Sequence, residues 1–229
     1  MTSLSTQPEK NRLLLLYTGG FVGVLVLSNI LAVKMVQIGP FVFDGGTLLF
    51  PLSYIFGDVL TEVYGYKKAR TVIWTGFAVL LTMVASIWLV SILPSVDEWN
   101  LQEAFDAILL QMPRIAGASI LGYFIGEYTN SVVLSKLKVK TNGKHLWLRT
   151  ISSTLAGQLL DSVIFVTIAF AGLYPVSVRI TMAVSNYLLK TVIEVLFTPI
   201  TYGVINTTKR IEGIDTFDNG ENYNPLPNK

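Results

Sequence analysis

Six apolar segments, each close to the length that crosses a bilayer, constrain this chain more than any other feature. About 20 apolar residues in a helix span the roughly 30 Å hydrocarbon core of a membrane. The chain is 52% hydrophobic and only 14% charged, which is too apolar for an ordinary soluble domain. The sequence therefore predicts an all-α integral membrane protein with six transmembrane helices. The segments are 13–33, 48–64, 71–93, 109–134, 150–172 and 181–205.

The basic residues outside these segments predict the orientation. Thirteen of the 17 Lys and Arg residues lie in the N-terminal tail, at 65–70, at 136–149 or in the C-terminal tail. Because Lys and Arg are enriched in cytoplasmic segments, we expect both termini in the cytoplasm. The acidic stretch 94–108 then lies outside, where its apolar spacing predicts a short amphipathic interfacial helix.

This reading divides the chain into three parts. Residues 1–12 form a cytoplasmic tail, 13–206 a single transmembrane domain with an uncleaved first span, and 207–229 a cytoplasmic tail. The last part is rich in Asn, Asp, Gly and Pro, so we expect it to be disordered. The basic loop 136–149 is expected to be solvated and to contact anionic lipid. It lacks the interleaved aromatic residues of a nucleic-acid site.

Ionisable and amide side chains inside the apolar segments point to a binding site. Each charge that faces lipid costs about 3 kcal/mol, so these groups should converge inside the protein. Acids outnumber bases among them, which suits a ligand with several N–H donors or a cation that moves with it. The alternative, that the acids only pair with Lys190 and a buried Arg114 to hold helices together, stays open. The predicted substrate-binding residues are Asn29, Asp58, Glu62, Glu127, Gln158, Asp161, Asn186, Lys190 and Glu194.

A weak internal repeat supports this convergence. Residues 54–68 and 123–137 align at an offset of 69, which pairs Asp58 with Glu127. Both copies run from outside to inside under the predicted orientation, so the repeat is parallel. The second and fourth spans are therefore expected to present equivalent acids to one central site.

Several kinds of chemistry are not expected from this composition. There is no cysteine, and the single histidine, His145, cannot form a histidine cluster. No G-x-x-x-x-G-K-[ST] motif is present to bind a nucleotide phosphate. We therefore predict neither a metal site nor a cofactor, and no enzymatic activity, because only bare carboxylates remain for catalysis.

Three separated motifs carry a family resemblance. FDGGTLLFPLSYIFGDVLTEVYGYKKAR, GQLLDSVIF and SNYLLKTVIEVLFTPITY closely resemble the queuosine precursor transporter family, also described as vitamin uptake transporters, over about residues 20–206. The resemblance implies import of a 7-deazaguanine, such as preQ0 or preQ1, across a bacterial inner membrane for tRNA queuosine synthesis. It also implies a six-helix fold resembling the substrate-binding subunits of energy-coupling-factor transporters. The alternative function is that of a binding subunit which serves a separate energising complex.

A deazaguanine has an aminopyrimidinone edge whose two N–H groups a carboxylate can accept in parallel. We assign recognition of this edge to Glu127 or Asp161, together with Gln158. Asn29 and Asn186 are secondary candidates. The counter-charges for the base and for helix closure are assigned to Asp58, Glu62, Lys190 and Glu194.

Aromatic and small residues add two further expectations. The aromatic residues considered for stacking on a ligand ring are Tyr54, Phe56, Tyr123 and Phe124. Gly19, Gly20 and Gly23 permit close helix approach within one subunit or between subunits, so a homo-oligomer is possible.

Overall fold

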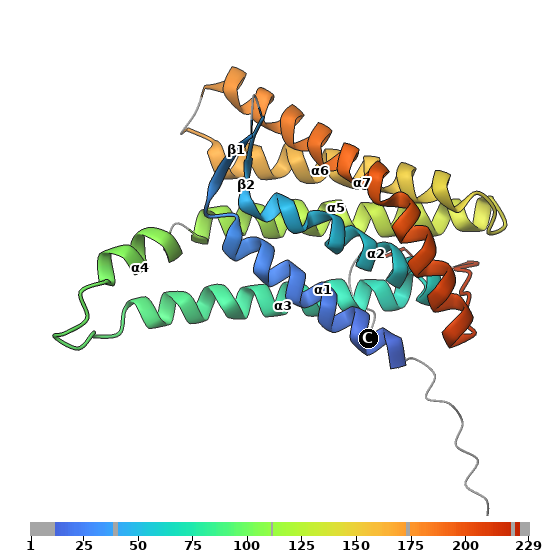
Figure 1. Ribbon diagram of the computed structural model, residues 1–229, viewed down its shortest axis with the longest axis horizontal. Helices are drawn as coiled ribbons and strands as arrows, with labels where there is room; N and C mark the ends of the chain where they lie inside the picture. The colour runs from blue at the N-terminus through green and yellow to red at the C-terminus, as the bar shows by residue number, and fades with distance from the viewer. Residues whose placement is uncertain (1–11, 39–40, 111, 173–174, 221–222, 225–229) are drawn as a thin grey trace, which may run out of the picture.

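The computed structural model describes residues 12–38, 41–110, 112–172, 175–220 and 223–224, and its described part is a helical bundle with one β-hairpin (Figure 1). Strands β1 (Met35–Ile38) and β2 (Phe41–Asp44) pair antiparallel, and a 3-10 helix, η1 (Gly45–Leu49), leads from them into α2. The hairpin lies between the first two predicted spans. The helices are α1 (Arg12–Leu31), α2 (Phe50–Tyr64), α3 (Tyr66–Ser91), α4 (Gln102–Leu109), α5 (Met112–Lys140), α6 (Leu146–Phe170) and α7 (Val176–Glu212).

Four of the described helices, α1, α3, α6 and α7, are long and apolar enough to cross a membrane. Their outward faces carry large exposed apolar side chains, such as Trp88 on α3 and Leu196 on α7. Together these helices identify a multi-pass membrane protein. Helix α2 has 15 residues and is only about 22 Å long, and α5 has 29 residues but a more polar sequence.

Helices α2 and α5 lie side by side and run in the same direction. The Ser53 hydroxyl lies 3.5 Å from the Tyr123 hydroxyl, and Thr61 Oγ1 lies 3.1 Å from Ser131 Oγ. Both contacts join residues 70 positions apart, and a constant offset means that the two helices are parallel. The two segments of the internal repeat are therefore parallel neighbours, as predicted.

Glycines bring α5 and α6 into backbone contact. A Cβ atom added to Gly126 would lie 2.9 Å from the Gly157 carbonyl oxygen, and one added to Gly157 would lie 2.6 Å from the Gly126 oxygen. Gly122 is equally close to the backbone of Asp161. The sequence GYFIG at 122–126 is thus a GxxxG contact, which allows membrane helices to approach closely.

The segments predicted to be cytoplasmic lie at one end of the bundle. The backbone N–H of Leu13 at the start of α1 donates to Glu212 at the end of α7 over 2.7 Å. Figure 1 shows the α5–α6 connection at the right of the view and α4 with the start of α7 toward the left. The long helices therefore alternate in direction between two ends.

The tail is ordered in its described part, so the prediction of a disordered tail is wrong there. Residues 207–212 continue α7. The backbone N–H of Thr216 donates to the Val63 oxygen over 3.2 Å, and the Asp218 carboxylate accepts from the Tyr66 N–H over 3.0 Å. The polar tail thus bonds to backbone groups that the ends of α2 and α3 leave free, which composition alone does not reveal.

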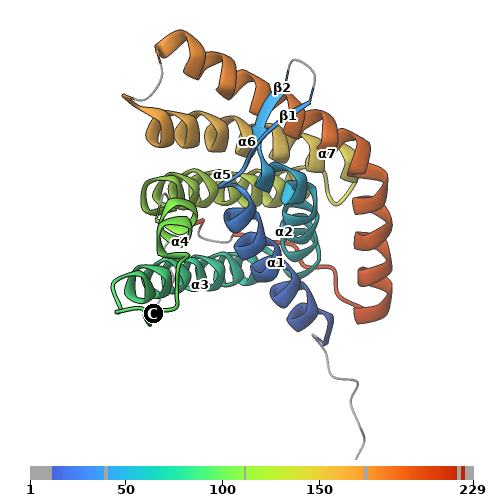
Figure 2. The same ribbon diagram turned by 60° about the vertical axis from the view of Figure 1, so that its left-hand side comes forward.

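Two further local features concern α7 and α4. Pro199 lies inside α7, and Figure 2 shows this helix turning sharply along its length, as expected for an interior proline. A short helix, α4, is present in the second half of the acidic stretch 94–108, and its place at the membrane surface stays a prediction.

Candidate functional site

The FDGGT sequence forms a tight turn against the end of α1. The backbone N–H and the hydroxyl of Thr47 each lie 3.1 Å from the Asp44 carboxylate, which therefore caps η1. A Cβ atom on Gly46 would lie 2.3 Å from the Ser28 carbonyl oxygen, so only glycine fits at that position. The turn fixes the Asp44 side chain beside α1 and α7.

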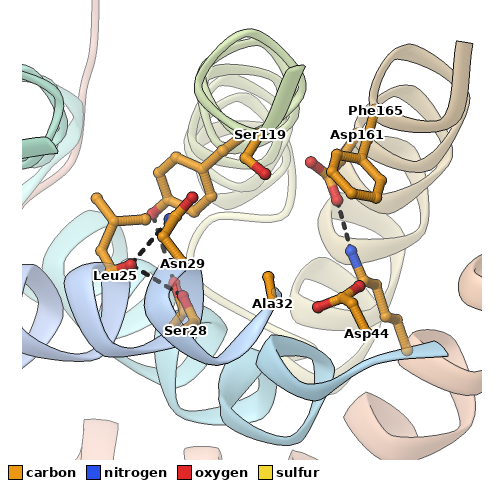
Figure 3. Close-up of a pocket in the computed structure, with 11 residues that line it drawn as sticks. Leu25, Ser28, Asn29, Ala32, Asp44, Ser119, Asp161 and Phe165 are labelled. Atoms are coloured by element: carbon orange, nitrogen blue, oxygen red, sulfur yellow. Dashed lines mark hydrogen bonds and ion pairs between the residues drawn. The ribbon is translucent and has the colours of Figure 1, made fainter. Parts of the chain in front are cut away.

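A pocket opens between this turn and helices α1, α2, α5, α6 and α7 (Figure 3). Its empty space is about 450 Å³, including what lies at its mouth. The side chains that line it with polar atoms or rings are Ser28, Asn29, Asp44, Ser53, Ser119, Tyr123, Asp161, Phe165 and Lys190.

Asp161 and Lys190 form an ion pair that lines the pocket. Lys190 Nζ lies 2.7 Å from Asp161 Oδ2, and both side chains are less than 5% exposed. Burial raises the pKa of the Asp44 carboxyl above its usual value, while the positive charge of Lys190 and the bonds from Thr47 oppose this shift. The pocket therefore offers two carboxylates and one ammonium group to a ligand.

A second group of polar side chains lies closed off from solvent and is called here the acceptor cluster. It consists of Asp58 on α2, Glu127 and Asn130 on α5, and Glu194 on α7, each at most 2% exposed. Asn130 Nδ2 donates to Asp58 Oδ1 over 3.1 Å. A Cβ atom on Gly57 would lie 2.2 Å from Glu127 Oε1, which places the Glu127 carboxylate against the α2 backbone beside Asp58.

A third group, the Glu62 cluster, neutralises its acid with several bases. Glu62 Oε1 lies 2.6 Å from Arg149 Nη2, 2.8 Å from Lys209 Nζ and 3.5 Å from Lys138 Nζ. Asp215 joins through Lys138 and Lys209. Partial burial alone would raise the pKa of Asp215, but hydrogen bonds and charge from the two lysines outweigh it and lower the pKa below its usual value.

This cluster corrects part of the prediction that the basic loop 136–149 is solvated, since Lys136, Lys140 and Lys144 are exposed as predicted but two other bases are not. Lys138 and Arg149 are each only 1% exposed. They turn inward because the buried carboxylate of Glu62 requires positive charge and hydrogen-bond donors.

The structure distributes the nine predicted site residues over three places. Those that line the pocket are Asn29, Asp161 and Lys190. Those in the acceptor cluster are Asp58, Glu127 and Glu194, and Gln158 is buried on α6 next to Gly157, which lies against Asn130. Glu62 lies apart from both, in its own cluster. Asn186 is buried one turn before Lys190, and its Oδ1 has no hydrogen-bond donor among the described residues.

Arg114 is not buried with the acids, so that prediction is wrong. Its side chain is exposed and donates to the carbonyl oxygens of Ile168, at 3.1 Å, and Ala171. A guanidinium at the carboxyl end of a helix satisfies carbonyl groups that lack intrahelical partners. Arg114 therefore caps α6.

The pocket also contains residues that the sequence did not assign to it. Asp44 was an evident candidate, because it is an acid that directly precedes a Gly-Gly turn. Ser119 and Phe165 gave no comparable signal. Of the four aromatic residues considered for stacking, only Tyr123 lines the pocket. Phe56 and Phe124 pack against the main hydrophobic core, and Tyr54 is buried beside the pocket without lining it.

Comparisons with known proteins agree with this arrangement. A family model described as "Putative vitamin uptake transporter" matches residues 44–204. A "Probable queuosine precursor transporter" of Bacillus subtilis is 30% identical over 77% of this chain and 78% of the relative. A "Queuosine precursor transporter" of Escherichia coli is 28% identical over 80% of this chain and 81% of the relative. No solved structure matches the chain.

Membrane-length helices around a charged pocket, together with these relatives, define the class as a multi-pass membrane transporter. Within that class, the chain belongs to the vitamin uptake transporter family that includes the queuosine precursor transporters.

Proposed function

We propose that this protein is a carrier that imports queuosine precursors, 7-deazaguanines such as preQ0 and preQ1, for tRNA queuosine synthesis. The observation that carries the proposal is the polar pocket wall, in which the Asp161–Lys190 pair and Asp44 line one pocket within a transporter of this family. Two relatives that each match more than three quarters of the chain carry the same functional name.

The chemistry of the pocket suits such a base. The Asp161 carboxylate accepts the paired N–H groups of the aminopyrimidinone edge, and Lys190 donates to the ring carbonyl. Phe165 and Tyr123 supply rings against which a planar base stacks. Asp161 is preferred over Glu127 for this role because Asp161 lines the pocket.

The chain crosses a bacterial inner membrane six times in this proposal, with both termini in the cytoplasm. The two further crossings are η1 with α2, which together cover 20 residues, and α5. The parallel arrangement of α2 and α5 supports this topology, since both then run from outside to inside. The basic segments gather at one end of the bundle, which is the cytoplasmic end by the distribution of Lys and Arg.

A bacterial strain that cannot make queuosine precursors tests the function directly. Each of preQ0, preQ1 and queuine is supplied to this strain with and without the gene, and queuosine in tRNA is measured. We expect modification at low precursor concentration only when the gene is present. Asp161→Asn should reduce uptake at least about tenfold, since a lost hydrogen bond to a charged group costs about 1.5–3 kcal/mol.

The matched control is Glu103→Gln, which changes an exposed acid on α4. Equal modification with and without the gene would refute the proposal. The alternative function, a binding subunit of an energy-coupled uptake system, predicts that the purified chain alone moves no precursor across vesicles and that ATPase subunits co-purify with it.

A further inference from the structure

The acceptor cluster lacks hydrogen-bond donors. Six oxygen atoms of its four side chains meet no donor among the described residues: one of Asp58, one of Asn130 and both carboxylate oxygens of Glu127 and of Glu194. Amide and ionised carboxylate oxygens can only accept hydrogen bonds. A buried acceptor without a donor is unfavourable, so the cluster needs a hydrogen-bond donor, which a protonated carboxyl group can supply.

The cluster also lacks positive charge. No ion pair within the described part of the chain reaches Asp58, Glu127 or Glu194. The buried bases are engaged elsewhere, Lys190 with Asp161 and Arg149 with Glu62. The three acids lie within electrostatic reach of one another. Like-charged carboxylates that share a desolvated site cannot all be ionised, so at least one of them holds a proton.

The titratable groups around the cluster do not provide its three acids with a basic partner. Neutral side chains lie beside two of the acids, Asn130 beside Glu127 and Thr154 beside Glu194. Toward the pocket lie the phenols of Tyr54 and Tyr123 and the Asp161–Lys190 pair. Toward the cytoplasmic end of α2 lies Glu62 with its bases. The Glu62 cluster holds three bases against the two acids Glu62 and Asp215, but none of these bases forms an ion pair with an acid of the acceptor cluster in the described part of the chain.

We propose that the acceptor cluster binds the proton that enters together with the substrate, so that the carrier is a proton-coupled symporter whose proton site lies beside its substrate pocket. This inference rests on the proposed function and adds the co-transported ion to it. A proton on Glu127 or Glu194 turns an acceptor into a donor, which can bond a neighbouring oxygen. The proton arrives from outside, is held by one carboxyl group and leaves to the cytoplasm with the substrate.

Two helices connect the proton site with the pocket. Helix α7 carries Lys190 in the pocket wall and Glu194 one turn further along, and α5 carries Tyr123 and Glu127 in the same relation. A shift of either helix on substrate binding therefore moves a residue of both sites. Shared rigid elements of this kind can couple the occupancy of two sites.

The test uses the purified full chain in sealed vesicles with a pH-sensitive dye inside and preQ0 as the substrate. We expect preQ0 influx to acidify the lumen. An inward proton gradient of about one pH unit should raise the accumulation ratio about tenfold if one proton accompanies each substrate. Glu127→Gln and Glu194→Gln imitate the protonated acid. They should retain exchange of preQ0 between lumen and medium but lose both acidification and gradient-driven accumulation.

Glu103→Gln, which alters an exposed acid, should behave like the natural protein. Influx of preQ0 without acidification, or with dependence on sodium instead of pH, would overturn the proton site and leave the proposed function intact. The Gln variants could instead lose preQ0 exchange and keep the number of protons moved per substrate. That result would make these acids substrate ligands and would also overturn the proton site.

A second measurement needs no substrate and tests directly whether the acceptor cluster holds a proton. It therefore still applies if no deazaguanine is transported, although that result would refute the proposed function. The infrared C=O band of protonated carboxylic acids should be present in the purified protein at neutral pH. It should weaken in Glu127→Gln or Glu194→Gln, and in Asp58→Asn if either variant fails to fold, but not in Glu103→Gln. No such difference between the natural protein and the folded variants would overturn the proton site.

Discussion

Asp58 and Glu62 lie one helical turn apart on α2, and both are fully buried, but their surroundings are opposite. Glu62 is contacted by Arg149 and Lys209 at less than 3 Å and by Lys138 slightly further away. Asp58 receives one hydrogen bond from a neutral amide. The comparison teaches that burial and helical spacing do not assign a role to an intramembrane acid. The role depends on whether the neighbouring helices supply basic side chains that neutralise the acid.

The comparison predicts its largest effect at Glu62. Glu62→Gln leaves three basic side chains without their shared anion, and breaking a buried ion pair on one side costs about 3–5 kcal/mol. Thermal unfolding in detergent should show a large loss of stability. Glu103→Gln, on the exposed face of α4, should stay within about 0.5 kcal/mol of the natural protein. A Glu62→Gln variant as stable as the natural protein would remove the distinction between the two acids.

The Asp161–Lys190 ion pair of the pocket should matter both for stability, as Glu62 does, and for transport, as Asp58 does. Lys190→Met leaves Asp161 buried without its partner and should destabilise the protein by about 3 kcal/mol. Adding Asp161→Asn to this variant removes the orphaned charge, so the double variant should regain most of the lost stability. Neither variant should transport preQ0. Restored uptake in the double variant would mean that the pair is purely architectural.

The close approach of α5 and α6 should sharpen the comparison, because it closes the acceptor cluster from one side. Gly126→Ala places a methyl group 2.9 Å from the Gly157 oxygen and should cost about 1–3 kcal/mol. Gly117→Ala on the same helix meets no atom within 4 Å and should be neutral or slightly stabilising. Equal unfolding temperatures for the two variants would show that the helices do not depend on this contact.

The smallest effect is expected at the rim of the Glu62 cluster. Because the folded pKa of Asp215 is lowered, its ionised form stabilises the protein above the ordinary carboxyl pKa of about 3.9, and this contribution is lost as pH falls through the folded value. Its side chain is 47% exposed, so the contribution should be below about 1 kcal/mol. Asp215→Asn should flatten the dependence of unfolding temperature on pH in that acidic range. An unchanged pH profile would contradict a stabilising role for the ion pairs of Asp215 with Lys138 and Lys209.

The sequence predicted the helices and the buried acids well, because membrane length and the cost of charge in lipid are local properties of a segment. It also indicated the parallel relation of residues 54–68 and 123–137. The partners of the acids were not predictable in the same way. Arg149 follows Glu62 by 87 positions, and only the tertiary packing of α6 against α5 and α7, which both also contact α2, brings them within 2.6 Å.

Two errors have the same origin. The basic loop was expected to be solvated throughout and the polar tail to be disordered, because their compositions are hydrophilic. Instead, Lys138 and Asp218 turn toward the bundle to satisfy groups at the ends of α2 and α3. Such needs arise from other parts of the chain, so they are invisible in the composition of the segment that meets them.

The most direct test compares Asp58→Asn with Glu62→Gln in two assays, unfolding in detergent and preQ0 accumulation per folded molecule under an inward proton gradient. We predict that Asp58→Asn unfolds close to the natural temperature but fails to accumulate preQ0. Glu62→Gln should unfold early, while the fraction that stays folded still accumulates it. The reverse pattern, or the same pattern for both variants, would contradict the account of one helix that carries a structural acid and a transport acid.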